Sequence, residues 1–183
     1  MKTQNQARIL IACIGNIFLG DDAFGVEVAR RLSRRRLPPE VRVIDFGIRG
    51  LDLAYAMLDG YETVVLVDAA PRGEEPGTLY VMEPKDHKLA ECFGASPLAD
   101  AHDLDPAKVL RLAAAMGGAT DRLLLVGCEP MPIGEADEMR MALSPPVRRA
   151  VGQAIPLIES LIEELLGGTR SSPAEHMTST AAR

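Results

Sequence analysis

Two adjacent acids, Asp21 and Asp22, follow the first apolar segment of the chain at the start of a predicted helix. The apolar segment ends at Gly15-Asn16, and a short loop leads from there to the acid pair. A strand–loop–helix turn of this kind usually presents backbone N–H groups to an anion. Because this chain places carboxylates there, the loop is better suited to a cation or to a carboxyl-dependent reaction than to a phosphate. The stretch contains neither GxGxxG nor GxxxxGK[ST], which agrees with that interpretation.

Two further side chains could complete such a site. Asp68 ends the apolar run TVVLVD, and His102 lies in AHDLDP, just ahead of a predicted helix. Two carboxylates and one imidazole suit a divalent ion such as zinc, nickel or iron. A simpler interpretation exists for each residue: Asp22 as a helix cap, Asp68 as an acceptor for loop N–H groups, and His102 as a solvated loop residue. A carboxyl pair of Asp22 and Asp68 that shares one proton, as in aspartic proteases, is a further alternative.

The elements that must position these residues alternate along the chain. Short apolar runs rich in Val, Ile and Leu predict strands, and apolar residues at helical spacing predict the helices between them. Asp105-Pro106 and Ser144-Pro145 are typical helix starts. The predicted strands cover 8–14, 41–46, 63–68, 78–82 and 122–128, and the predicted helices cover 22–36, 51–58, 106–116 and 144–166.

This alternation predicts a three-layer α/β/α domain of the doubly wound type. Its mostly parallel, twisted sheet has about five strands, and the strand at 78–82 could form an antiparallel edge. In such sheets, sites form beyond the carboxyl ends of the strands. Asp22 follows the first strand and Asp68 ends the third, so we expect them at the same rim, with Asp22 as the site residue and Asp21 as a helix-start or supporting residue.

The chain is predicted to form one domain over residues 1–167, with 168–183 as a disordered C-terminal tail. Between the fourth strand and the next helix, residues 83–105 have no clear period, and loops of that length are usually functional or mobile. An arginine-rich run at 30–36 is interpreted either as a solvated surface or as a docking surface for an acidic partner. A turn at Gly47–Gly50 is expected near the site, with Asp45 bonded to it.

Composition excludes several classes of function. The net charge of −6 and the scarcity of aromatic residues disfavour nucleic acid as a partner. No apolar run approaches the ~18 residues that would predict a membrane span, and the N-terminus lacks the apolar region of a signal peptide. The three cysteines, Cys13, Cys92 and Cys128, form no CxxC pair and predict no disulfide framework. These features favour a cytoplasmic protein.

Several motifs, in order, resemble those of one known family. The opening IGNIFLGDDAFGVEVARRL resembles the signature of the nickel–iron hydrogenase maturation endopeptidases. The later segments DFGIRGLDL, TVVLVDAA, PGTLY, HDLDPAKVL and LLLVGCEP resemble further segments of that family in the same order. The resemblance extends over about residues 9–166. Three departures concern the substrate groove: Ile48 stands where the family often has Thr, Ala23 stands where it often has Gly, and the residues after Ser96-Pro97, in the loop of the histidine, differ.

The resemblance implies roles for individual residues. The metal-contacting positions of the family fall on Asp22, Asp68 and His102, which we expect to carry both metal contact and catalysis. The glycine turn, formed by Gly47, Ile48, Arg49 and Gly50, is expected to contact the backbone of the substrate. Arg49 is expected to pair with an acidic or carboxyl group of that substrate.

The function that the resemblance implies is that of an aspartyl-type endopeptidase with a protein substrate. Such enzymes remove a C-terminal extension from the precursor of a nickel–iron hydrogenase large subunit after nickel insertion, and so activate the hydrogenase. We therefore expect no tightly bound cofactor, with nickel supplied by the substrate, and a monomer. The alternatives are a non-enzymatic, chaperone-like module that reads the nickel site, and a flavodoxin-like phosphate binder or hydrolase.

Overall fold

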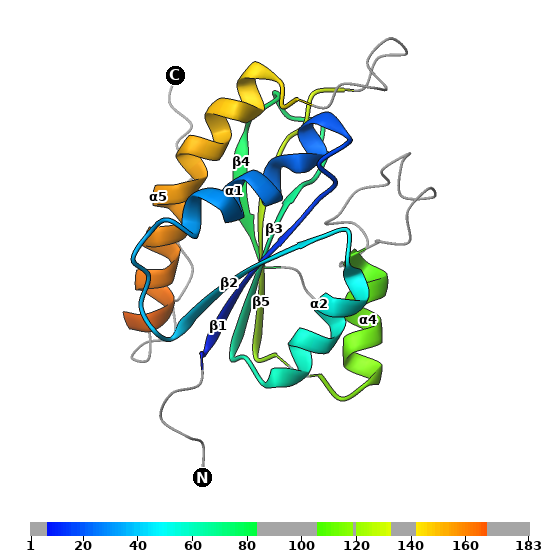
Figure 1. Cartoon of the computed structure of the whole chain (residues 1–183), viewed down its shortest axis with the longest axis vertical. Coiled ribbons are helices and arrows are strands. Elements are labelled where there is room, and N and C mark those ends of the chain that lie inside the picture. The colour runs from blue at the N-terminus through cyan, green and yellow to red at the C-terminus, as the bar shows by residue number, and fades with distance from the viewer. Residues whose placement is uncertain (1–6, 84–105, 119, 133–141, 168–183) are drawn as a thin grey trace, which may run out of the picture.

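A five-stranded sheet forms the centre of the computed structural model, and two pairs of helices cover its faces (Figure 1). The structure describes residues 7–83, 106–118, 120–132 and 142–167. The strands in the described part are β1 Ile9–Ile14, β2 Val41–Gly47, β3 Thr63–Ala69, β4 Leu79–Met82 and β5 Arg122–Cys128. The helices are α1 Phe24–Leu32, α2 Gly50–Ala56, α4 Pro106–Ala115 and α5 Pro145–Gly167, with short 3-10 turns η1 Gly20–Ala23 and η2 Met57–Asp59.

The sheet confirms the predicted mixture of strand directions. Its strand order is β2-β1-β3-β5-β4. β1 pairs in parallel with β2 and β3, and β5 pairs in parallel with β3. β4 alone pairs antiparallel, with β5, and forms one edge of the sheet. In this edge strand only Val81 is exposed and the other three residues are half-buried, whereas β1 is buried along its whole length.

Each face of the sheet has its own apolar core. The core under α1 and α5 includes Phe24 and Ile158, and the core under α2 and α4 includes Leu10 and Leu66. Successive residues of a strand point to opposite faces, so even-numbered residues of β3 face α2 and α4. Cys13 and Cys128 are buried in the first core as free thiols, where they pack as small apolar residues.

The chain changes direction across the sheet at β1. After β1 it moves outward through α1 to β2, and after β2 it crosses through α2 on the other face to β3. The carboxyl ends of β1 and β3 therefore lie next to each other at the switch in strand order. This is the place where ligands bind in open α/β sheets.

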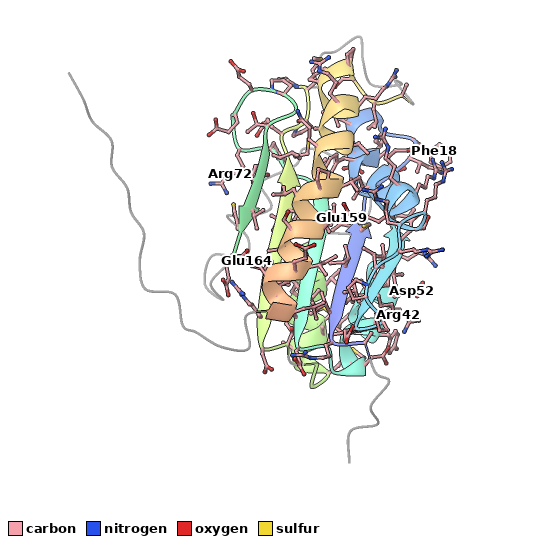
Figure 2. The ribbon with its side chains drawn as sticks, turned by 90° about the vertical axis from the view of Figure 1, so that its left-hand side faces the viewer. Phe18, Arg42, Asp52, Arg72, Glu159 and Glu164 are labelled. Carbon is pink, nitrogen blue, oxygen red and sulfur yellow. The ribbon has the colours of Figure 1, made fainter. Side chains whose placement is uncertain are left out.

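The arginine-rich run lies on the surface beside α5. Arg30 pairs with Glu27 on α1, and Arg35 makes two hydrogen bonds to Glu159 of α5, at 2.8 and 3.1 Å. Figure 2 shows α5, with Glu159 on it, lying lengthwise over the sheet. These ion pairs are exposed, which favours the interpretation as a solvated surface. Among the described helices, none is both long and apolar enough to cross a membrane.

Candidate active site

The carboxylate of Asp22 is held by the loop that follows β1. Its Oδ2 accepts a hydrogen bond from the backbone N–H of Asn16 at 2.6 Å. The side chain of Asn16 is buried in turn, and its Oδ1 accepts from the N–H of Phe18 at 3.0 Å. The loop therefore closes on itself through Asp22. The alternative interpretation of Asp22 as a helix cap is wrong, because no side chain caps η1 or α1.

Gly15 allows this loop to close. Its φ of +141° is a conformation that L side chains rarely adopt. A Cβ at this position would also lie 2.0 Å from the backbone oxygen of Asp22. The end of β1 and the acid pair can therefore approach each other only because residue 15 has no side chain.

Asp21 makes different contacts from Asp22. Its carboxylate accepts hydrogen bonds from the N–H and the hydroxyl of Ser144, at 2.6 and 2.8 Å, and from the N–H of Met131 at 2.9 Å. It thus joins η1 to the start of α5 and to the segment after β5. This agrees with the expectation that Asp21 supports the site rather than forming it.

Asp68 lies at the carboxyl end of β3, beside the acid pair. Burial raises the pKa of Asp68 well above 3.8, and the nearby charge of Asp22 raises it further, while a backbone hydrogen bond with Ala69 lowers it. β1 and β3 are neighbouring strands, and the effect of the Asp22 charge on Asp68 indicates that the two carboxyl groups lie near each other. The structure therefore brings these two predicted site residues together at one rim of the sheet.

Replacing Asp68 by Asn is expected to raise the free energy of unfolding at neutral pH. At a pH below the ordinary carboxyl pKa, Asp68 is protonated in both the folded and the unfolded state, so its raised pKa does not change the free energy of unfolding. As the pH rises from there toward the folded pKa, the unfolded chain ionises while the folded protein keeps the proton, so stability falls. Each unit by which the pKa is raised corresponds to about 1.4 kcal/mol.

Urea denaturation of wild type and Asp68→Asn from acid to neutral pH measures this difference. The stability advantage of the variant should grow with pH and then level off. A difference that is constant across the pH range would contradict the prediction.

His102, the third predicted ligand, lies outside the described residues. Within the part of the chain that the structure describes, no group of three or more His, Cys, Asp or Glu side chains could hold a metal ion. Asp22 and Asp68 are the two members of the predicted ligand set that the structure describes. Their oxygen atoms suit a divalent cation when a nitrogen ligand completes the set.

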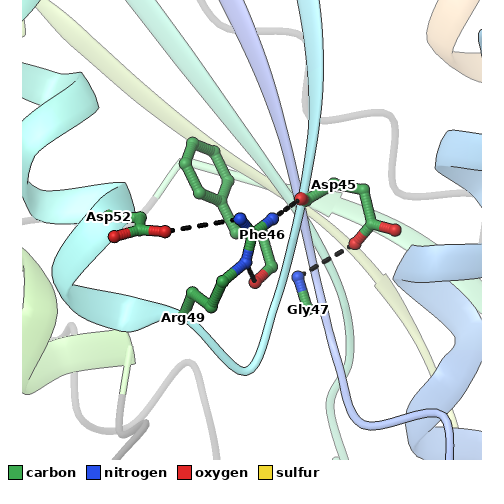
Figure 3. A network of polar contacts seen from close by, with 5 residues as sticks. All are labelled: Asp45, Phe46, Gly47, Arg49 and Asp52. Carbon is green, nitrogen blue, oxygen red and sulfur yellow. Dashed lines mark hydrogen bonds and ion pairs between the residues drawn. The ribbon is translucent and has the colours of Figure 1, made fainter.

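The glycine turn lies beside the loop that carries Asp22. Gly15 donates a hydrogen bond to the carbonyl of Gly47 at 3.0 Å, which joins the two loops. As expected, Asp45 bonds to the turn: its Oδ1 accepts from the N–H of Gly47 at 2.9 Å, and Gly47 has the positive φ of +53° that the turn needs. Figure 3 shows the bond between Asp45 and Gly47.

Arg49 stabilises the same turn from outside. Its guanidinium donates to the carbonyls of Phe46, at 3.1 Å, and of Asp45, and lies 3.4 Å from Asp52 (Figure 3). The side chain is 60% exposed, so a partner could still contact it. Ile48 is also exposed, next to the glycine.

Two residues near this rim were not singled out from the sequence. Glu129, directly after β5, is buried, and its carboxylate accepts from the N–H groups of Arg72 and Gly73, at 2.7 and 3.2 Å. An acid directly after a buried strand is the same signal that marked Asp68, so the same reasoning could have found it. Tyr80 of β4 donates a hydrogen bond from its hydroxyl to the carbonyl of Ala70. Burial and the charge of Glu129 raise the pKa of Tyr80, which keeps this donor protonated.

Comparison with known proteins gives a consistent result. A family model described as hydrogenase maturation protease matches residues 26–161, which includes Asp68 and His102 and begins just after Asp22. The hydrogenase expression/formation protein HupM of Azotobacter chroococcum is 32% identical over 178 residues, 96% of this chain and 82% of that protein. The hydrogenase 2 maturation protease of Escherichia coli is 28% identical over 169 residues, 92% and 94% of the two chains.

Solved structures agree with these sequence relatives. The hydrogenase maturating endopeptidase HybD from E. coli aligns with a TM-score of 0.71 and 28% identity, over 86% of this chain and 93% of that one. A [NiFe] hydrogenase maturation protease HycI from Thermococcus kodakarensis aligns with a TM-score of 0.65 and 27% identity, over 86% and 93%. The chain therefore belongs to the hydrogenase maturation proteases and is an endopeptidase that acts in hydrogenase maturation.

Proposed function

We propose that this protein removes a C-terminal extension from the precursor of a nickel–iron hydrogenase large subunit, after nickel has been inserted. The observation that carries the proposal is the pair Asp22 and Asp68. Asp22 lies in η1 after β1, and Asp68 lies near the carboxyl end of the neighbouring strand β3, close enough for the charge of Asp22 to raise the pKa of Asp68. The membership of the chain in the maturation protease family supports the same substrate class.

The nickel in this proposal belongs to the substrate. Asp22, Asp68 and His102 offer it two oxygen donors and one nitrogen donor. A cation that arrives near Asp68 favours the charged carboxylate and displaces its proton. Precursor without nickel leaves the two acids facing each other with nothing to complete the site, so cleavage depends on loading.

Hydrolysis can follow two routes from this arrangement. Either the substrate's metal polarises a water molecule beside the scissile bond, or one of the carboxylates takes a proton from that water as general base. Both routes use the same residues and both place the attacking water at the rim between β1 and β3. The protein needs no tightly bound cofactor of its own in either case.

Exposed apolar side chains beside the acids support a protein substrate. Phe18, on the loop that Asp22 closes, is 59% exposed, and Figure 2 shows it at the periphery of the molecule. Ile48 of the glycine turn is 51% exposed, and the two loops are joined by the hydrogen bond between Gly15 and Gly47. Large apolar side chains that are exposed on ordered loops suit a partner that covers them. We propose that the segment 47–50 contacts the backbone of the substrate there.

Incubation with precursor in two forms tests the proposal. The protein is mixed with nickel-loaded and with nickel-free large-subunit precursor, and the products are weighed by intact-protein mass spectrometry. Only loaded precursor should lose a C-terminal peptide. A stable complex without mass loss would indicate the binding-module alternative, to which the relatives give no support, and cleavage of both forms would contradict the role of nickel.

Arg49→Ala is expected to weaken binding of the precursor about 10-fold or more, because a charge-assisted hydrogen bond contributes roughly 1.5 kcal/mol or more. The change also removes the bonds to the carbonyls of Asp45 and Phe46, so a turn-stabilising role must be separated from a binding role. Arg49→Lys keeps the charge but not the fork and is a matched control. Surface plasmon resonance with immobilised precursor measures the affinity, and an unchanged dissociation constant for Arg49→Ala would contradict the pairing.

We propose that the reaction takes place in the cytoplasm and that the protein acts as a monomer, as predicted from the sequence. The proposal also keeps the large-subunit precursor as the only macromolecular partner.

A further inference from the structure

Asp68, Gly127 and Tyr80 form one row across the sheet. Asp68 of β3 is paired with Gly127 of β5, and Gly127 is paired with Tyr80 of β4. Paired residues point to the same face of a sheet. That face is the one covered by α2 and α4, because Leu66, Leu125 and Tyr80 all belong to that core.

The middle position of this row has no side chain, and Tyr80 fills the space. A Cβ on Gly127 would lie 2.2 Å from Cε2, 2.3 Å from Cζ and 2.5 Å from the hydroxyl oxygen of Tyr80. The far end of the ring therefore lies directly over Gly127, and the side chain leans from the edge strand across β5 toward β3. Only glycine at position 127 permits this.

The hydroxyl of Tyr80 ends at the segment that follows Asp68. It donates to the carbonyl of Ala70, whose own N–H donates to the carbonyl of Cys128 at 3.0 Å. Farther along this segment, the guanidinium of Arg72 lies over the Tyr80 ring, 5.3 Å from its centroid. The carboxylate of Glu129 binds the backbone N–H of Arg72 at 2.7 Å. The turn after Asp68 is thus wrapped around Tyr80.

We propose that Tyr80 is a positioning residue for the cleavage reaction: seated over Gly127, it fixes the turn that follows Asp68 and closes the β4 side of the Asp68 carboxyl group. The proposal rests on the proposed function, in which Asp68 contacts the nickel of the substrate. Asp68 is the next-to-last residue of β3, so its orientation depends on the turn that follows. Tyr80 constrains that turn from two strands away.

Steady-state kinetics with loaded precursor tests this role. Tyr80→Ala removes the ring and the hydroxyl and should lower kcat about 100-fold, because a misplacement of about 1 Å at a reacting group costs that much. KM should stay within about 2-fold, since a positioning residue acts through Asp68 and not through substrate binding. Tyr80→Phe keeps the ring over Gly127 and should recover much of the loss, with kcat within about 10-fold of wild type. Val81→Ala changes the neighbouring, exposed residue on the other face and should leave both constants unchanged.

A second variant displaces the ring without changing it. Gly127→Ala places a methyl group where the ring lies and should lower kcat as Tyr80→Ala does. In the double variant the methyl group meets no ring, so Gly127→Ala should add less than about 2-fold to the effect of Tyr80→Ala. All rates are referred to the folded fraction from circular dichroism, so that loss of fold is not counted as loss of kcat.

The outcomes separate this role from the proposed function. Cleavage by wild type together with the expected kcat losses supports both. Cleavage by wild type with Tyr80→Ala within about 2-fold of its kcat, or with a change in KM alone, would overturn the role of Tyr80 and leave the proposed function standing. Absence of cleavage by wild type would overturn the proposed function and the role of Tyr80 with it.

Discussion

Asp22→Asn is expected to abolish cleavage of nickel-loaded precursor, with a rate loss of at least about 100-fold. The amide keeps an oxygen that can accept from the N–H of Asn16, a bond that measures 2.6 Å in the wild type, so the loop should keep its shape. It removes the negative charge that both proposed routes of hydrolysis need. The measurement is the rate of C-terminal mass loss from loaded precursor, with the thermal unfolding midpoint recorded alongside.

Two companion variants make this result specific. Asp121→Asn removes an exposed charge at the opposite end of the sheet, just before β5, and should process precursor at the wild-type rate. His102→Ala should match Asp22→Asn if the imidazole completes the site. Normal processing by both Asp22→Asn and His102→Ala would remove the assignment of this rim as the active site.

Gly25→Ala is expected to lower the free energy of unfolding by about 3 kcal/mol or more, or to prevent folding. Gly25 lies at the start of α1, where the helix touches the sheet. An added Cβ would lie 2.2 Å from the carbonyl oxygen of Ile14 and 2.4 Å from that of Val67. Both are backbone atoms of central strands and cannot move aside. In an open helix position the same change would be favourable by up to ~1 kcal/mol, so the overlap decides the sign.

A second helical glycine provides the control. Gly152 lies in α5, and a Cβ there would meet only the end of the Arg31 side chain, at 3.4 Å. Gly152→Ala should therefore stabilise the protein by roughly 0.5–1 kcal/mol. Urea denaturation of both variants gives the comparison. Equal effects of the two substitutions would show that helix propensity, and not contact with the sheet, determines the outcome at residue 25.

The fold could be predicted from the sequence because its signals are local. A strand that is buried on both faces is apolar through its centre, as the runs that became β1, β3 and β5 are, and helices between such strands indicate parallel crossovers. The alternation of residue types at 78–82 predicted the edge strand, and the antiparallel pairing of β4 with β5 confirms its direction. The boundaries differed slightly, since the helix expected from residue 22 is preceded by the 3-10 turn η1.

The candidate site could be predicted only in part. Acids at strand ends point to one rim in any parallel sheet, which is why Asp22 and Asp68 were identified correctly as neighbours. The interpretation of Asp22 as a helix cap was wrong because capping is only a local preference, whereas contacts with other segments of the chain hold the acid pair. Asp21 accepts from Ser144, 123 residues away in sequence.

The sequence by itself determined the fold class, the family and the rim at which the acids gather. These follow from residue types and spacings that act over a few positions, or from an ordered series of motifs. The tertiary structure alone decided which distant segments Asp21 joins, and that Tyr80 lies over Gly127 in the row that contains Asp68. Such assignments depend on strand register and on hydrogen bonds between segments far apart in the chain, and no local pattern specifies them.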